Sequence, residues 1–260
     1  MPTRNQVGVH FRLMCKTRKK RAKRALGTTL GLMEQDLAYR FDISQSTVSR
    51  IVMTWINFMY LEFKKIPLWP PKELVQANMP KIFKQQYPNT RVILDATEVY
   101  IDQPHLPDIQ QMTFSNYKNS NTFKVLIGIS PDGVVTFISS LYPGFISDKE
   151  LTRQSGIYTL LEPGDSVMAD RGFNIEDDLI LKGVQLNIPP FLRDKKQFSE
   201  NELVITRRIA SLRIHVERAM EKIKNFHIFD RSLPVQMTDI ANRLFFVCCV
   251  LTNFQEPLCT

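Results

Sequence analysis

Residues 91–101, RVILDATEVYI, set β-branched and apolar side chains around a single acid, Asp95. This composition predicts a buried strand, because β-branched residues fit a pleated sheet. A carboxylate inside an apolar strand is costly to bury unless it binds a metal ion or a cationic partner. The stretch therefore predicts both a strand of the core and an acid with a function.

The sequence that follows predicts the rest of a sheet. Four further segments have the strand pattern: TFKVLIGIS (122–130), GVVTFISSLY (133–142), DSVMADRGF (165–173) up to Asp170, and VQLNIPP (184–190). The first two are joined by Ser130-Pro131-Asp132-Gly133, a strong hairpin turn. Helices are predicted at 148–161, 174–183, 200–226 and 238–254. This order predicts an α/β fold, with a mixed five-stranded sheet flanked by helices as in the RNase H fold.

Residues 31–63 are helical in pattern. MEQDLAYRF (33–41) and QSTVSRIVMTWINFMYLEF (45–63) each place apolar residues on one face, with a polar break at 42–44. This is the helix-turn-helix pattern, although helical hairpins in enzymes share it. Ser44 is a suitable N-cap for the second helix. The exposed start of that helix then carries the predicted DNA-binding residues Gln45, Ser46, Thr47 and Arg50.

The positive charge is concentrated in the first quarter of the chain. Residues 1–60 contain eleven Lys and Arg and three acids, whereas residues 61–260 contain 23 of each. Such asymmetry predicts a polyanionic partner, most often nucleic acid. Within the run KTRKKRAKR (16–24), Lys19, Lys20 and Arg21 are predicted to bind DNA. The run also fits a nuclear localisation signal, so we expect the nucleus, and its ordinary alternative is a solvated tail.

Four segments are expected along the chain: a basic arm (1–30), a helix-turn-helix region (31–63), a connector (64–90) and an RNase H-like catalytic domain (91–255). The connector should carry a short helix at about 72–86, broken at Pro80. The four cysteines have neither zinc-site nor disulfide spacing, which predicts a reducing compartment. The apolar run 244–251 is too short to cross a bilayer, so no membrane partner is expected.

Three acids are the candidate catalytic and metal-binding residues: Asp95, Asp170 and Glu217. Asp170 ends a strand, at the edge where ligands gather in open α/β sheets, and Glu217 lies on the long helix one turn after Arg213. Carboxylate oxygens are hard ligands for Mg²⁺ or Mn²⁺, and a pair of such ions activates water and stabilises a leaving oxygen. Singly, Asp170 also fits a turn cap, and Glu217 an i, i+4 partner of Arg213.

At these residues the chain resembles the DDE transposases of the Harbinger/PIF-like superfamily, which carry a preceding helix-turn-helix. The resemblance spans about residues 32–259 and rests on DLAYRFDISQSTVSRI, VILDATEV, MTFSNYKNSNTFKVLIGISPDG, SLYPGFISDKEL, DSVMADRGF, LNIPPF and RIHVERAMEKIKNF. It implies an RNase H-like core, divalent-metal catalysis, and nicking and strand transfer at terminal inverted repeats. It also implies Asp95, Asp170 and Glu217 as the three acids, with Asp148 beside them. From its place on the helix, Arg213 is expected to orient Glu217 or to contact a substrate phosphate.

The implied partners are DNA, at transposon ends or at a target, and further copies of the chain assembled on it. A separate Myb-like DNA-binding protein is a further candidate partner. The main alternative is a catalytically inactive, transposase-derived DNA-binding protein, and a weaker one is a scaffold that binds through the basic arm. An intact acid triad favours the enzyme, because a DNA-binding protein has no need of three clustered carboxylates.

Overall fold

The computed structural model describes residues 32–190 and 199–255, and the basic arm with Lys19, Lys20 and Arg21 lies outside them. In the described part of the chain, the helices before the sheet are α4 (Glu34–Phe41), α5 (Gln45–Lys64), α6 (Lys72–Asn78) and α7 (Lys81–Gln86). Because α6 and α7 lie on either side of Pro80, the predicted break in the connector is confirmed.

The sheet is mixed, as predicted. Its strands are β1 (Thr90–Tyr100), β2 (Phe114–Ser115), β3 (Ser120–Ile129), β4 (Val135–Ile138), β5 (Tyr142–Pro143), β6 (Ser166–Met168) and β7 (Gln185–Asn187). The order is β2-β3-β1-β6-β7, and β4 and β5 pair with β3. β1 is antiparallel to β3 and parallel to β6, which is parallel to β7. This topology is that of an RNase H-like α/β fold.

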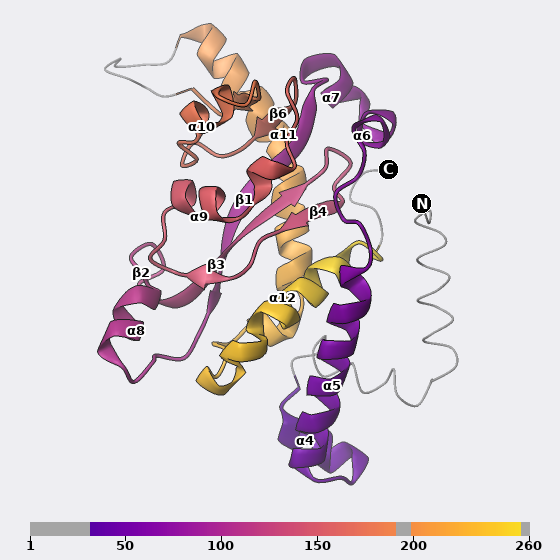
Figure 1. Cartoon of the computed structure of the whole chain (residues 1–260), viewed down its shortest axis with the longest axis vertical. Coiled ribbons are helices and arrows are strands. Elements are labelled where there is room, and N and C mark those ends of the chain that lie inside the picture. Colours follow the sequence, from indigo (N-terminus) through magenta and orange to yellow (C-terminus); the bar gives the residue numbers. More distant parts are fainter. Residues whose placement is uncertain (1–31, 191–198, 256–260) are drawn as a thin grey trace.

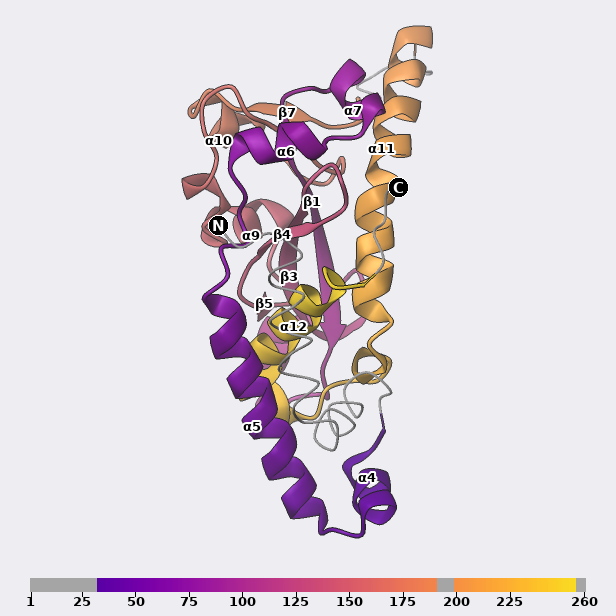
Figure 2. The same ribbon diagram turned by 90° about the vertical axis from the view of Figure 1, so that its right-hand side faces the viewer.

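Helices cover both faces of the sheet (Figures 1 and 2). The later helices are α8 (Pro107–Thr113), α9 (Asp148–Gln154), α10 (Glu176–Ile180), α11 (Glu200–Lys224) and α12 (Thr238–Thr252). The alternation along β1 divides the core between the faces: Ile93 packs with α11 and α12, whereas Val92 and Leu94 pack with α9 and α10. None of the described helices is long and apolar enough to cross a membrane.

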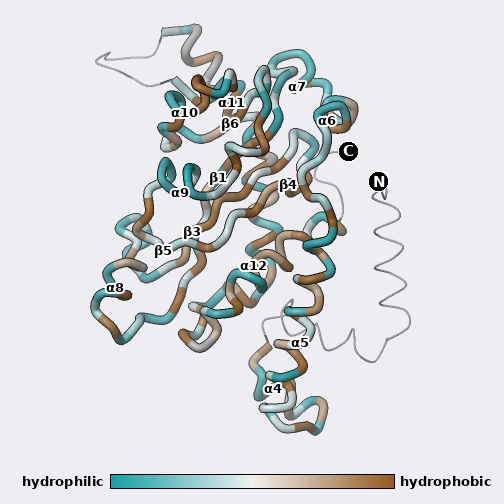
Figure 3. The backbone as a smooth tube through the Cα atoms, viewed as in Figure 1, coloured by the Kyte–Doolittle hydropathy of each residue, from teal (hydrophilic) through white to brown (hydrophobic). Residues whose placement is uncertain are grey.

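Helix α5 connects the helix-turn-helix region to the core. Its first half packs with α4, where Leu37 and Val48 are buried, and its second half packs on α12 (Figure 1). At that contact Phe63 is buried, and the rings of Tyr60 and Phe246 lie 5.3 Å apart. The apolar residues of α12 and of the strands gather at the centre of the molecule, whereas α4 projects from it (Figure 3).

A buried ionic cluster fixes residues 69–72 to the sheet. The Lys72 ammonium lies 2.8 Å from Asp165 Oδ1, and Asp165 is 1% exposed. The Arg91 guanidinium stacks over the Trp69 ring at 4.8 Å and donates to the carbonyl of Pro70. A carboxylate this deeply buried requires cationic partners, so removing Lys72 or Arg91 would loosen the connector.

Several element boundaries differ from the sequence predictions. The helix expected at 148–161 ends at Gln154, because Gly156 adopts a positive φ of 83° and a 3-10 turn (Ile157–Thr159) follows. The helix expected from Asn174 starts at Glu176, because Ile175 is buried in the core and takes the N-cap position. Helix α8 and strand β2 were not predicted. The short 3-10 turns His227–Phe229 and Val235–Met237 link α11 to α12.

Candidate active site

A cleft of about 770 Å³ opens where β1 extends beyond β6. Strand β6 pairs with β1 only as far as Ile93, whereas β3 accompanies β1 from Ile93 to Tyr100. One edge of β1 is therefore free of β6 beyond this point, and the cleft takes side chains from both faces of the sheet. All three predicted acids, Asp95, Asp170 and Glu217, line it.

Asp95 lies largely buried in the floor of the cleft. It shares a face of β1 with Ile93 and Val99, and this face is directed toward α11. The Ala96 N–H donates to its Oδ1 at 3.0 Å. Burial raises the pKa of the Asp95 carboxyl to about 6; the Asp170 charge adds to the rise, whereas Arg213 opposes it. The carboxylate form is thus held at a cost that a bound cation would offset.

Asp170 lies in the turn after β6, which ends at Met168, two residues before the strand end predicted at Asp170. The Arg171 N–H donates to its Oδ1 at 2.7 Å, as in the turn cap that its position allowed. Arg213 Nη1 lies 2.9 Å from the same oxygen, and its side chain is only 11% exposed. The structure thus pairs Arg213 with Asp170, from a different element, rather than with Glu217 on its own helix.

Glu217 is exposed on α11 and enters the same cleft. Its neighbours Val216 and Met220 are buried, which fixes the helix against the sheet. Among the side chains that the structure describes, no three of the acidic, His or Cys type are close enough, as they stand, to hold one metal ion. The donor set still suits a hard cation, because it is made of carboxylate oxygens and the Asp95 and Asp170 charges repel each other.

Asp148 begins α9 and lies on the opposite wall of the cleft. Lys124 Nζ lies 2.8 Å from its Oδ1 and also donates to the Ile146 carbonyl at 3.2 Å. A Cβ at Gly172 would lie 3.4 Å from Asp148 Oδ2, so Asp148 adjoins the turn that holds Asp170. Asp148 thus lines the same cleft as Asp95, Asp170 and Glu217.

The sequence analysis missed five charged residues of the cleft: Glu98, Lys118, Lys124, Glu221 and Lys224. Lys124 had the same signal as Asp95, a charge within an apolar strand. Glu221 lies one helical turn after Glu217, so periodicity would have placed it on the same face. Glu98 accepts a hydrogen bond from Thr122 Oγ1 at 2.8 Å, a cross-strand contact that no local pattern reveals.

At the outer end of α5, Ser44 is the N-cap, as predicted. Its Oγ accepts from the Thr47 N–H at 3.2 Å and lies 3.0 Å from Ser46 Oγ. Arg50 Nε donates to the Ser46 carbonyl at 3.2 Å. Gln45, Ser46 and Arg50 are exposed and Thr47 is partly so, which leaves these side chains open to a ligand.

Comparison with known proteins agrees with this architecture. Residues 94–253 match the family model described as DDE superfamily endonuclease, and residues 30–65 match helix-turn-helix of DDE superfamily endonuclease. The chain is 22% identical, over 235 residues, to a Protein ALP1-like of Arabidopsis thaliana. The match covers 82% of this chain and 54% of the relative. It therefore spans about half the length of that curated relative.

No solved structure matches the chain. The endonuclease match nevertheless extends over more than half of the chain and includes Asp95, Asp170 and Glu217, and the second match covers α4 and α5. The resemblance seen in the sequence is thereby confirmed. The chain belongs to the DDE superfamily of endonucleases, of the transposase type with an N-terminal helix-turn-helix.

Proposed function

We propose that the chain is a divalent-metal-dependent DNA endonuclease that nicks DNA and transfers the cut strand at transposon ends. The observation that carries the proposal is the meeting of Asp95, Asp170 and Glu217 in one cleft, with Asp95 largely buried. A largely buried acid beside another acid costs the fold stability at neutral pH unless a cation offsets the charge, and such costly acids gather at functional sites.

Asp95, Asp170 and Glu217 are the residues that would hold Mg²⁺ or Mn²⁺. Such ions supply an activated water and stabilise a leaving 3′-oxygen. Among the protein's own groups, Lys124 and Lys224 bring positive charge to the cleft for DNA phosphates. Arg213 neutralises Asp170 in this structure, and once released its planar guanidinium suits a phosphate in a bidentate contact.

DNA binding is assigned to the N-terminal segments. Gln45, Ser46, Thr47 and Arg50 would contact bases and phosphates, and Lys19, Lys20 and Arg21 of the arm would contact phosphates alone. The proposal has three further parts. The protein acts in the nucleus, several copies assemble on DNA, and a Myb-like protein is an accessory partner. In this scheme the helix-turn-helix selects the site and the cleft performs the chemistry.

The test is a nicking and strand-transfer assay on supercoiled DNA with Mn²⁺. Wild type should convert the plasmid to nicked circles, and Asp95→Ala should reduce this rate by at least about a thousandfold. Asp177→Asn is the matched control, because Asp177 is an exposed acid on α10 outside the cleft. Equal rates for wild type and Asp95→Ala would overturn the proposal.

A second function, a catalytically inactive DNA-binding protein, is favoured by the Arg213–Asp170 ion pair, which satisfies a triad acid without metal. The two functions differ in their response to Mn²⁺. The inactive protein would bind DNA with the same salt dependence as the active enzyme. It would leave supercoiled DNA intact at every Mn²⁺ concentration.

A further inference from the structure

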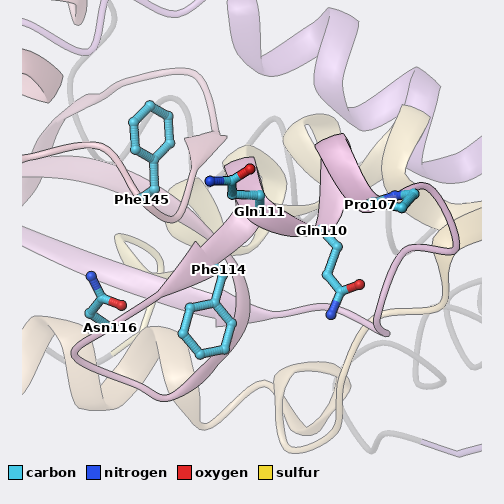
Figure 4. Close-up of a pocket in the computed structure, with 6 residues that line it drawn as sticks. All are labelled: Pro107, Gln110, Gln111, Phe114, Asn116 and Phe145. Carbon is cyan, nitrogen blue, oxygen red and sulfur yellow. The ribbon is translucent and has the colours of Figure 1, made fainter.

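A second hollow has a volume of about 420 Å³, and Figure 4 shows the side chains that line it. It is lined by Pro107, Gln110, Gln111, Phe114, Asn116 and Phe145. These residues come from α8, from β2 and the turn after it, and from the loop after β5. The lining combines two aromatic rings with three carboxamides and carries no charge.

Buried polar contacts hold the walls of this hollow in place. Asn121 Nδ2 donates to the Gln110 carbonyl and to Thr113 Oγ1, both at 2.8 Å. The Gly144 N–H donates to the Thr122 carbonyl at 3.0 Å, and a Cβ at Gly144 would lie 2.1 Å from Thr122 Oγ1. Both walls are therefore fastened to β3, so the hollow exists before any ligand binds.

The hollow and the catalytic cleft are lined by neighbouring residues of the same two chain segments. Asn116 is followed directly by Tyr117 and Lys118, which line the cleft. Phe145 is followed by Ile146, whose carbonyl accepts the hydrogen bond from Lys124 at the cleft wall. The two hollows are therefore neighbours along these segments, within the reach of adjacent nucleotides of one strand.

The chemistry of the lining identifies the class of ligand. Phe145 is 64% exposed, and within residues 32–190 and 199–255 the side-chain amides of Gln110, Gln111 and Asn116 have no hydrogen-bond partner. An exposed ring stacks on a planar apolar face, and carboxamides pair with the donor and acceptor edge of a base. A phosphate would require cations, which this lining lacks.

We propose that the hollow binds one unpaired base of the DNA strand that lies in the catalytic cleft. The inference rests on the proposed function, since it assumes that the cleft takes DNA. Stacking and edge contacts of this kind strengthen binding by roughly five- to a hundredfold for each base. The hollow would favour DNA that is frayed or already cut beside the reacting phosphate over a continuous duplex.

The experiment compares a blunt duplex with the same duplex carrying a three-nucleotide unpaired 3′ end, both in EDTA so that no cleavage intervenes. A 2-aminopurine in the unpaired end reports stacking through loss of its fluorescence. Wild type should bind the frayed duplex about tenfold more tightly and quench the probe. Phe145→Ala and Gln111→Ala should reduce this preference while leaving blunt-duplex affinity unchanged.

Leu181→Ala is the matched control, because Leu181 is 87% exposed and lines neither hollow. Equal wild-type affinity for the two duplexes would overturn the inference and leave the proposed function standing. Absence of binding to either duplex would remove both. A Phe145→Ala variant that keeps the preference but loses self-association in sedimentation would show a contact between copies, which also overturns the inference.

Discussion

The outer end of α5 and the floor of the cleft present polar groups to a ligand in opposite ways. At α5, Gln45, Ser46 and Arg50 are exposed and make only local hydrogen bonds. In the cleft, Asp95 is largely buried, next to a second acid and a guanidinium. The first arrangement costs the fold little, whereas the second makes the carboxylate expensive in the absence of a cation.

This difference shows how affinity and chemistry are divided along the chain. Exposed cations attract a polyanion from many directions. Their removal weakens DNA binding but costs the fold little stability. A catalytic carboxylate must be held in one geometry and shielded from water, which burial provides. Variants at the N-terminal end should therefore change DNA binding without changing the core, and variants in the cleft should do the reverse.

The largest effect is expected from deleting residues 1–30, which removes nine cations and no acid. DNA affinity at low salt should fall by about a hundredfold or more, and each lost phosphate contact should flatten the slope of log K against log salt by about 0.9. Titrations at several salt concentrations measure both quantities. Identical slopes for the full and shortened chains would mean that the arm does not contact DNA.

The second prediction concerns Asp95→Asn in EDTA. The folded pKa of about 6 lies above the unfolded value near 3.9, so the folded state binds more protons between these pH values. The free energy of unfolding of the wild type is therefore least reduced by Asp95 at low pH, and it falls as pH rises through 6. Replacing the carboxyl should stabilise the protein by about 2 kcal/mol at pH 7.5, and the gain should vanish near pH 4.

Urea unfolding at the two pH values measures this difference, with Asp177→Asn as the control for loss of one negative charge. A destabilised Asp95→Asn at pH 7.5 would show that the carboxylate is already satisfied without metal. The comparison between the two regions would then lose its physical basis.

The smallest effect is expected at the outer end of α5. Ser44→Ala removes the oxygen that accepts from the Thr47 N–H and should destabilise the helix by about 1 kcal/mol. DNA affinity should drop, because the first turn of α5, which carries Gln45 and Ser46, is no longer held in place. Plasmid nicking at saturating DNA should stay unchanged. An equal loss of nicking at saturation would indicate that the two regions are coupled.

Strands β1, β3, β4, β6 and β7 could be predicted, because their apolar patterns and the turn at 130–133 are local signals. Asp95 could be found for the same reason, as a charge within an apolar run. Helix α8 and the hollow beside the cleft could not. Their supports, Thr113, Ser115 and Asn121, are buried polar residues joined by hydrogen bonds, which in sequence look like a surface loop.

Other misses share a tertiary cause. The Arg213 side chain had an acid one turn away on its own helix, yet it reaches Asp170 on a separate element. Strand β6 ends before Asp170 because its last backbone contact, from the Ala169 N–H to the Asn187 carbonyl, is followed by a turn. Neither partner lies near in sequence, so periodicity alone cannot select it.

The most direct test of the central claim is thermal unfolding in EDTA and in saturating Mn²⁺, for wild type and Asp95→Asn. A cation present at a free concentration of one hundred times its dissociation constant stabilises the fold by about 2.7 kcal/mol. For a chain of this size this raises Tm by roughly 5–10 °C. We predict that rise for wild type and little or none for Asp95→Asn. A wild-type Tm that is the same in EDTA and Mn²⁺, or equal rises for both proteins, would contradict a metal site built on Asp95, Asp170 and Glu217.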